Sequence, residues 1–231
     1  MMKNIISVVI AAYNEAPRIA EVLSVVEHHP LIGEVIVIND GSTDNTSQVA
    51  NKFDVKLIEN KNNLGKTLSI KKGIKNSKYN LILLLDADLK GLNQNYIKML
   101  VSPVIDGKVD WTLSLRKNSF KIMKLMKMDW MSGERVIPKH LLNDPIIWSR
   151  PDIGYSLETL INKSLLTKKT TFRTVYLDNV SNINKSKKIG FIKGWFNNII
   201  MVKQISKVVP IYEFFWQFLK MSYLNRKYSK R

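Results

Sequence analysis

The chain has 231 residues, is 45% hydrophobic and carries a formal charge of +17. A chain of this length and composition can bury an ordinary core, so intrinsic disorder is excluded as the default state. It contains no cysteine, which excludes a disulfide framework and a thiolate metal site and fits a reducing compartment.

The first half of the chain alternates between predicted strands and predicted helices. Apolar runs predict strands over residues 5–12, 34–39, 55–58 and 81–85. Between them, helices are predicted over about 16–28, from a cap at Ser42 or Asp44 to Phe53, and over 66–74. The first strand turns polar too soon for a signal peptide. This alternation predicts an α/β fold with a mainly parallel sheet flanked by helices.

Polar residues follow three of these strands directly. They form the segments Tyr13–Glu15, Asp40–Ser42 and Asp86–Asp88. Ligands of parallel sheets bind beyond the carboxyl ends of the strands. The three segments therefore predict one site at one edge of the sheet.

The pair Asp86 and Asp88 is the strongest of these signals. Two carboxylates one residue apart at the end of an apolar strand are costly unless cations or hydrogen-bond donors compensate them. A Mg²⁺ or Mn²⁺ ion that also binds phosphate oxygens is the usual compensation. The alternative is that Asp88 caps a following helix or turn.

The second half has a different pattern. It predicts a Lys- and Met-rich segment at 120–131, a loop at 145–151, a helix that opens at 153–158 and a strand at 172–178. Ten of the fourteen residues over 211–224 are apolar, and Glu213, Gln217 and Lys220 form a polar stripe. This segment is too short to span a bilayer and is flanked by Lys and Arg, as in an interfacial helix on anionic lipid. The alternative is a helix that packs on the protein's own core or on a second subunit of a homo-oligomer.

The charge is unevenly distributed. Residues 1–110 hold 13 of the 36 Lys and Arg and 12 of the 19 Asp and Glu, which leaves +16 on residues 111–231. A basic half predicts an anionic partner such as a membrane surface or a phosphorylated acceptor, and a solvated lysine-rich surface is the alternative. Nucleic acid is not expected, because the basic residues form no recognisable binding module or aromatic platform.

Four ordered segments resemble the family-2 glycosyltransferases of GT-A fold, over about the first 115 residues. They are Val8–Glu15, Val37–Thr46, Asn62–Lys66 and Leu85–Asp88. The resemblance implies an inverting transferase that uses a UDP- or GDP-sugar donor and a divalent metal. The donor-binding residues that it implies are Ala11, Ala12, Tyr13, Asn14, Glu15, Asp40, Lys66, Asp86, Ala87 and Asp88.

The resemblance also implies individual roles for these residues. Asp40 and the first segment would hold the base and ribose of the donor, and Lys66 would face its phosphates or base. Asp88 would ligate the metal, with Asp86 near the ribose or the metal. Some relatives complete the metal shell with a later histidine, but here that stretch reads Ser181–Asn184. Water or an Asn would therefore complete the shell, or the metal would bind only together with the donor.

Residues 154–158 resemble an element of relatives that glycosylate phosphorylated or polyprenyl-type acceptors. This implies Glu158 as the catalytic base, with Asp152 as the reserve candidate, and Glu158 would orient rather than abstract if the acceptor is a phosphate. Tyr155 and Arg135 would bind the acceptor. The alternatives are a solvated helix carboxylate for Glu158 and an ordinary surface residue for Arg135.

Together these patterns predict a GT-A catalytic domain over residues 1–190 and a basic helical tail over 191–231. The donor half would cover 1–115 and the acceptor half 116–190. We expect a cytoplasmic protein that binds peripherally to the inner face of the cell membrane and acts on a lipid-linked or phosphorylated acceptor. A nucleotidyltransferase and a non-catalytic protein that binds anionic polymers are the alternatives.

Overall fold

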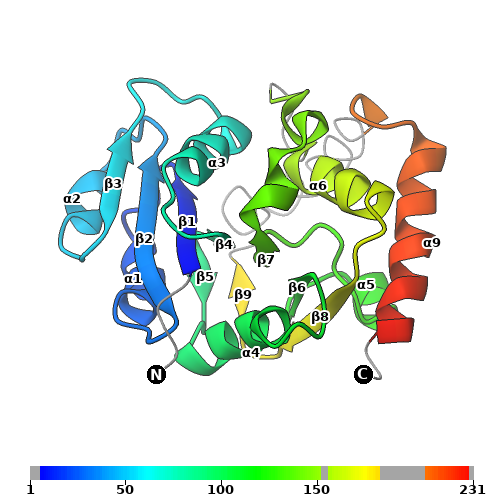
Figure 1. Cartoon of the computed structure of the whole chain (residues 1–231). Helices are drawn as coiled ribbons and strands as arrows, with labels where there is room; N and C mark the ends of the chain where they lie inside the picture. The colour runs from blue at the N-terminus through cyan, green and yellow to red at the C-terminus, as the bar shows by residue number, and fades with distance from the viewer. Residues whose placement is uncertain (1–5, 152–155, 183–205, 229–231) are drawn as a thin grey trace.

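The apolar runs of the chain form a seven-stranded sheet in the computed structural model, which describes residues 6–151, 156–182 and 206–228 (Figure 1). The strand order is β3-β2-β1-β4-β7-β6-β8. Only β7 runs antiparallel to its neighbours, so the predicted mainly parallel α/β sheet is confirmed. The strands are β1 Ile6–Ala12, β2 Ile32–Asn39, β3 Lys56–Glu59, β4 Leu81–Asp86, β6 Trp111–Arg116, β7 Arg135–Pro138 and β8 Phe172–Leu177.

A second, two-stranded sheet lies directly after the Asp pair. It pairs β5 (Leu89–Lys90) with β9 (Ser181–Asn182) in antiparallel register, with Leu89 opposite Asn182. This pairing brings the stretch around Ser181 next to Asp88, although the two segments are far apart in the sequence.

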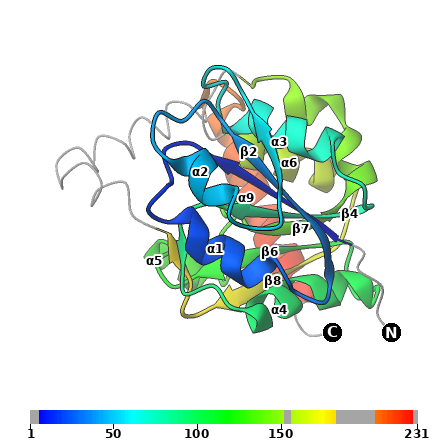
Figure 2. The ribbon, with the colours of Figure 1, turned by 90° about the vertical axis from the view of Figure 1, so that its left-hand side faces the viewer.

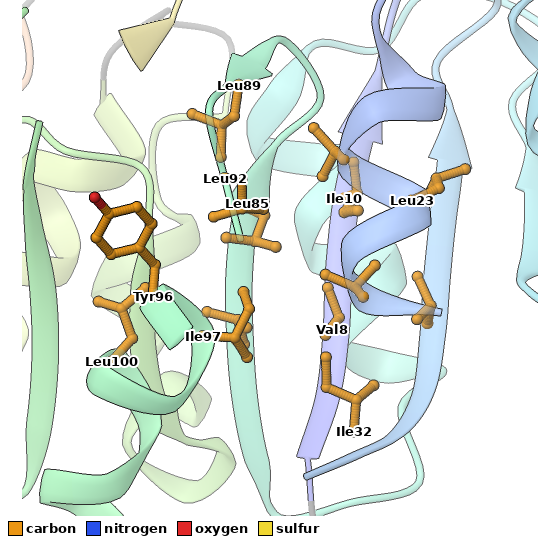
Figure 3. Packing of buried hydrophobic residues seen from close by; sticks show 14 of the residues in the cluster. Val8, Ile10, Leu23, Ile32, Leu85, Leu89, Leu92, Tyr96, Ile97 and Leu100 are labelled. Atoms are coloured by element: carbon orange, nitrogen blue, oxygen red, sulfur yellow. The ribbon is translucent and has the colours of Figure 1, made fainter. Parts of the chain in front are cut away.

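Helices cover both faces of the large sheet (Figures 1 and 2). They are α1 Ile19–Val26, α2 Thr46–Ala50, α3 Lys66–Lys75, α4 Gln94–Ile105, α5 Lys121–Leu125, α6 Ser156–Thr167 and α9 Ile211–Tyr228, with 3-10 turns at Lys139–Asn143 and Pro145–Trp148. Alternate strand residues therefore enter two cores. Val8 and Ile10 pack with α1 and α4 (Figure 3), whereas Val9 packs with α3 and α6 on the other face.

The boundaries differ from the predictions where tertiary contacts decide. Helix α1 begins three residues later than expected, and α2 ends at Ala50 rather than Phe53. The predicted cap at Ser42 or Asp44 is wrong, because Asn45 holds the N-cap position of α2. Asp44 lies one residue before it, and its Oδ1 accepts from the Thr46 N–H at 3.0 Å. The stretch expected to be a loop at 145–151 contains a 3-10 turn. Strands β6 and β7 were not predicted at all.

Helix α9 forms where a helix was expected and continues to Tyr228. The predicted polar stripe is wrong at Gln217, which is only 2% exposed and faces the protein. One face of α9 packs on α6 and β8, so the alternative of packing on the protein's own core is confirmed for that face. Within the described ranges, no helix has the length and apolar character that crossing a membrane requires.

Candidate functional site

The loops after β1 and β2 are tied together at the carboxyl edge of the sheet. Asn14 adopts a left-handed backbone with φ of 55°. Its N–H donates to Ser42 Oγ at 3.0 Å, and its Oδ1 accepts from the Thr43 N–H at 2.9 Å. The Glu15 N–H donates to Thr46 Oγ1 at 2.9 Å. Two of the three predicted strand-end segments therefore form one structure.

An open cleft of about 620 Å³ lies beside these loops, lined by residues that follow β1, β2 and β3. Tyr13 is 46% exposed at its rim. Gly41 has φ of 70°, and a Cβ there would lie 2.6 Å from the Asn62 carbonyl carbon, so the turn requires glycine. The volume lies within the range of small-molecule sites and is sufficient for a nucleoside.

Asp40 is buried and organises the wall of this cleft. Its Oδ1 accepts from Asn60 Nδ2 at 2.8 Å and from the Leu64 N–H at 2.9 Å, and its Oδ2 accepts from the Gly65 N–H at 2.9 Å. The carboxylate thus holds the loop that leads into α3 and sets the position of Lys66. Direct contact between Asp40 and a nucleotide remains a prediction.

Lys66, at the start of α3, joins two other predicted site residues. Its Nζ lies 2.8 Å from Asp86 Oδ1 and 2.8 Å from Glu158 Oε1. These residues come from α3, the end of β4 and the first turn of α6, and they line one small cavity. The structure therefore brings together the candidate phosphate-binding lysine, one Asp of the pair and the candidate base.

Arg116 is a further residue of this cluster that the sequence analysis missed. It ends β6 and is 8% exposed, with its guanidinium 3.6 Å from Asp86 and 3.2 Å from Glu134. Its buried Nε has no hydrogen-bond partner. The alternating apolar residues before it were the available signal, because they mark a strand whose carboxyl end reaches the same edge.

The local charges keep Asp86 ionised. Burial alone would raise its pKa, but the charges of Lys66 and Arg116 lower the pKa of Asp86 to about 2. Burial raises the pKa of the neighbouring Glu134 above its usual value, and the Arg116 charge offsets this only in part. Asp86 therefore carries its charge throughout the neutral pH range.

The prediction that Arg135 binds an acceptor phosphate is not supported by its surroundings. Its side chain is fully buried. The guanidinium donates to the Ser132 carbonyl at 2.8 Å, to Asn162 Oδ1 at 2.6 Å and to the Trp130 carbonyl at 2.8 Å. These bonds fasten β7 to α6, at the wall of the small cavity that Asp86 and Glu158 also line.

Gly133 gives the Asp86 carboxylate its space. A Cβ at this position would lie 2.7 Å from Asp86 Oδ1. We expect Gly133→Ala to displace Asp86 from Lys66, to lower activity at least tenfold and to cost about 1–3 kcal/mol of stability. Steady-state kinetics and thermal unfolding measure these two effects.

Gly73→Ala is the matched control for that change. A Cβ added at this position would lie 2.4 Å from Val9 Cγ1, in the core between α3 and β1 and away from Asp86. We expect a comparable loss of stability with near-normal turnover of the folded fraction. Equal activity losses in both variants would show that Gly133 acts only through stability.

The residues present fit a divalent metal that also binds phosphate. Among the residues described, no group of three His, Cys, Asp or Glu is placed to hold a metal ion. Asp88 is half-buried, and Asp86 is engaged by Lys66 and Arg116. Mg²⁺ and Mn²⁺ commonly take one or two carboxylates and fill the remaining positions with phosphate oxygens and water. This donor set therefore suits Asp88 as the main protein ligand.

Two predicted residues, Asp152 and Tyr155, lie outside the described residues, as do Ile183 and Asn184. The predicted Ala11, Ala12 and Ala87 contribute backbone at the ends of β1 and β4, where Ala11 lies opposite Asp86 in the register. The carboxyl ends that carry the candidate site are therefore adjacent in space.

The sheet order and the strand-end loops define a GT-A fold. The chain belongs to glycosyl transferase family 2, whose family model matches residues 7–176. The resemblance inferred from four short segments is thereby confirmed.

Parts of the chain are also similar in sequence to known glycosyltransferases. Over 88 residues the chain is 38% identical to a poly-beta-1,6-N-acetyl-D-glucosamine synthase of Staphylococcus epidermidis, a match that covers 36% of this chain and 21% of that protein. Over 94 residues it is 33% identical to a dolichyl-phosphate beta-glucosyltransferase of Trichomonas vaginalis, a match that covers 35% and 28%. The chain thus matches less than a third of the length of either relative.

Solved structures show the same fold over most of the chain. A glucosyl-3-phosphoglycerate synthase of Mycobacterium tuberculosis, in complex with Mn²⁺, uridine diphosphate and phosphoglyceric acid, superimposes with a TM-score of 0.69 at 17% identity. The match covers 90% of this chain and 79% of that chain.

Proposed function

We propose that this chain transfers a sugar, with inversion, from a UDP- or GDP-sugar to a phosphorylated acceptor that is either soluble or lipid-linked. The observation that carries the proposal is that Asp86 and Glu158 both contact the ammonium group of Lys66. Membership of the family and the names of its relatives support the reaction class.

The donor would lie across the carboxyl ends of β1, β2 and β4. The cleft lined by Tyr13 and Asn60 suits its nucleoside. Lys66 would face the diphosphate, since a lysine is a compact point charge for phosphate. A bound Mg²⁺ or Mn²⁺, held by Asp88, would supply charge neutralisation of the leaving diphosphate.

Glu158 would act on the acceptor. Its side chain is 8% exposed, and its Oε1 accepts a hydrogen bond from Lys66 Nζ at 2.8 Å. Donor phosphates that attract Lys66 would release Glu158 to accept the proton of an acceptor hydroxyl. With a phosphate oxygen as nucleophile, no strong base is needed and Glu158 would orient the acceptor.

Arg116 would support the acceptor side of the site. Its guanidinium lies at the end of β6, beside Asp86, with the buried Nε lacking a hydrogen-bond partner. A planar guanidinium suits the oxygens of a phosphate group. The relatives named for dolichyl phosphate and for phosphoglycerate support a phosphorylated acceptor, and the basic second half supports one presented at the inner face of the cell membrane.

A panel of nucleotide sugars tests the proposal by thermal shift. We expect one UDP- or GDP-sugar to raise the unfolding temperature in the presence of Mn²⁺ or Mg²⁺, and chelation of the metal to remove most of that rise. The Asp88→Asn variant should show no metal-dependent rise. If no nucleotide sugar shifts the transition, or if wild type and variant respond alike, the proposal is wrong.

The same protein preparation tests the alternative activity, nucleotidyl transfer. A nucleotidyltransferase would release pyrophosphate from a nucleoside triphosphate in the presence of a sugar phosphate. We expect no such release above the level of the Asp88→Asn variant. Metal-dependent pyrophosphate release by wild type alone would replace the proposed transfer reaction with nucleotidyl transfer.

A further inference from the structure

Helix α9 presents large apolar side chains to the outside of the molecule. Six of them are half-exposed or more, and together they form what we term the α9 outer face: Ile211, Tyr212, Phe215, Trp216, Leu219 and Tyr223. Their spacing of three or four residues places them along one side of the helix. Figure 1 shows α9 at the edge of the molecule, on the opposite side from β2 and β3.

The side of α9 that faces the protein is unusually polar. Gln217, Ser222 and Asn225 are each less than 5% exposed. Asn225 accepts from the Thr174 N–H at 3.1 Å and donates to the Lys127 carbonyl at 3.0 Å, which fastens the helix to β8 and to the segment after α5. Met221 is buried beside these polar groups and Phe218 packs against the same core, while six further large apolar side chains stay outside. A helix that exposes this many large apolar side chains is the reverse of an ordinary water-facing surface helix.

The charges around this face are almost all positive. In residues 206–228 the cations are Lys207, Lys220, Arg226 and Lys227, whereas the single acidic residue is Glu213. Glu213 is neutralised by Lys163, whose Nζ lies 2.7 Å from Glu213 Oε1. Lys220 Nζ lies 4.4 Å from the centre of the Trp216 ring. A cation therefore lies directly over an aromatic ring of the kind that membrane interfaces favour.

The neighbouring α5 has the same composition. Phe120, Ile122 and Leu125 are at least half-exposed. Residues 117–128 contain four exposed lysines and no acidic residue. The hydrogen bond from Asn225 to the Lys127 carbonyl and the packing of Trp130 on Phe218 bring α5 next to α9. Nine of the thirteen large apolar side chains that are exposed in the described residues lie on or directly before these two helices, so the exposed apolar area is concentrated there.

We propose that the α9 outer face, flanked by the lysines of α5, docks the protein on an anionic lipid bilayer. The aromatic and aliphatic side chains would enter the headgroup boundary, and Lys220, Arg226 and Lys227 would neutralise lipid headgroups. A second copy of the chain is a poorer occupant, because a two-fold contact through this face sets its cations against one another. The inference goes beyond the proposed function, because lipid binding needs neither donor nor metal.

Vesicle co-sedimentation of the full chain without nucleotide tests this surface. We expect binding to vesicles of equal parts phosphatidylcholine and phosphatidylglycerol to exceed binding to phosphatidylcholine vesicles at least tenfold, and to weaken at high salt. Trp216→Ser combined with Leu219→Ser should lower the binding constant about tenfold or more. Arg226→Glu combined with Lys227→Glu should abolish the preference for phosphatidylglycerol.

Matched controls come from α4, which carries an exposed lysine next to an exposed methionine. Lys98→Glu combined with Met99→Ser makes the same kinds of change there and should leave vesicle binding unchanged within about twofold. All variants replace exposed side chains, and thermal unfolding checks that each is folded. Nucleotide-sugar thermal shifts should be equal in all of them, which separates lipid binding from donor binding.

Sedimentation equilibrium of the wild type tests whether a second copy of the chain, rather than a lipid bilayer, covers the α9 outer face. A monomer that binds anionic vesicles through the α9 outer face supports the proposal. A dimer that the Trp216→Ser and Leu219→Ser changes dissociate, with no vesicle binding, assigns the face to a second copy. Failure of the wild type to bind phosphatidylglycerol vesicles, in any oligomeric state, also overturns the proposal.

Discussion

Asp88→Asn is expected to lower sugar transfer by about a thousandfold or more, because it removes the carboxylate best placed to hold the metal beside the donor diphosphate. The side chain keeps its shape and is only half-buried, so we expect a stability change within about 1 kcal/mol. Turnover of the donor with saturating Mn²⁺ measures the first effect. Titration of Mn²⁺ in the presence of the nucleoside diphosphate should show weakened metal binding.

Asp54→Asn is the control for that change. Asp54 is also an Asp outside the helices and strands, but it lies in the turn before β3, away from Asp86 and Asp88. Its variant should retain wild-type turnover and metal titration. A folded Asp88→Asn protein with turnover within tenfold of wild type would contradict a metal-binding role for Asp88.

Glu158→Gln is expected to lower kcat by about a hundredfold to ten-thousandfold if the acceptor nucleophile is a hydroxyl, because the amide cannot accept its proton. The amide oxygen introduced by this change can still accept a hydrogen bond from Lys66, and Lys66 keeps its contact with Asp86 at 2.8 Å. KM for the donor should therefore change only severalfold. Steady-state kinetics with both substrates varied separates the two parameters.

The same variant distinguishes the two acceptor chemistries. A loss of kcat below tenfold, with a raised KM for acceptor, is the result expected of an orienting residue and a phosphate nucleophile. Glu21→Gln provides a control on α1, on the other face of the sheet. A folded Glu158→Gln protein with unchanged kcat and unchanged KM for both substrates would remove Glu158 from the site.

The donor side of the fold was predictable because it follows from local rules. Each of the segments at Tyr13, Asp40 and Asp86 comes at the end of an apolar run, and parallel strands bring such ends to one edge. The register confirms this, with Ala12 opposite Asn39 and Ala11 opposite Asp86. Lys66 was predicted from the family resemblance and not from these local rules, and the structure shows that Asp40 holds the loop that precedes it.

The second half was harder to predict because its contacts are long-range. In β6 the polar Thr112 and Ser114 alternate with apolar residues, so the pattern could mark the strand that ends in Arg116, but not that both of its faces are buried. Arginine is typical of protein surfaces, so nothing in the sequence indicated that Arg135 is buried. Its structural role follows only from the three hydrogen bonds that its guanidinium donates inside the protein. Helical spacing alone could not identify the buried face of α9, because apolar residues outnumber polar ones over the whole helix.

The most direct test of the central claim is a crystal structure of the protein with a nucleoside diphosphate and Mn²⁺. The account predicts the base and ribose in the cleft beside Tyr13 and Asn60, and the metal on Asp88. Lys66 should approach the diphosphate and release Glu158. A nucleotide bound elsewhere, or a metal bound without contact to Asp88 or Asp86, would contradict the account.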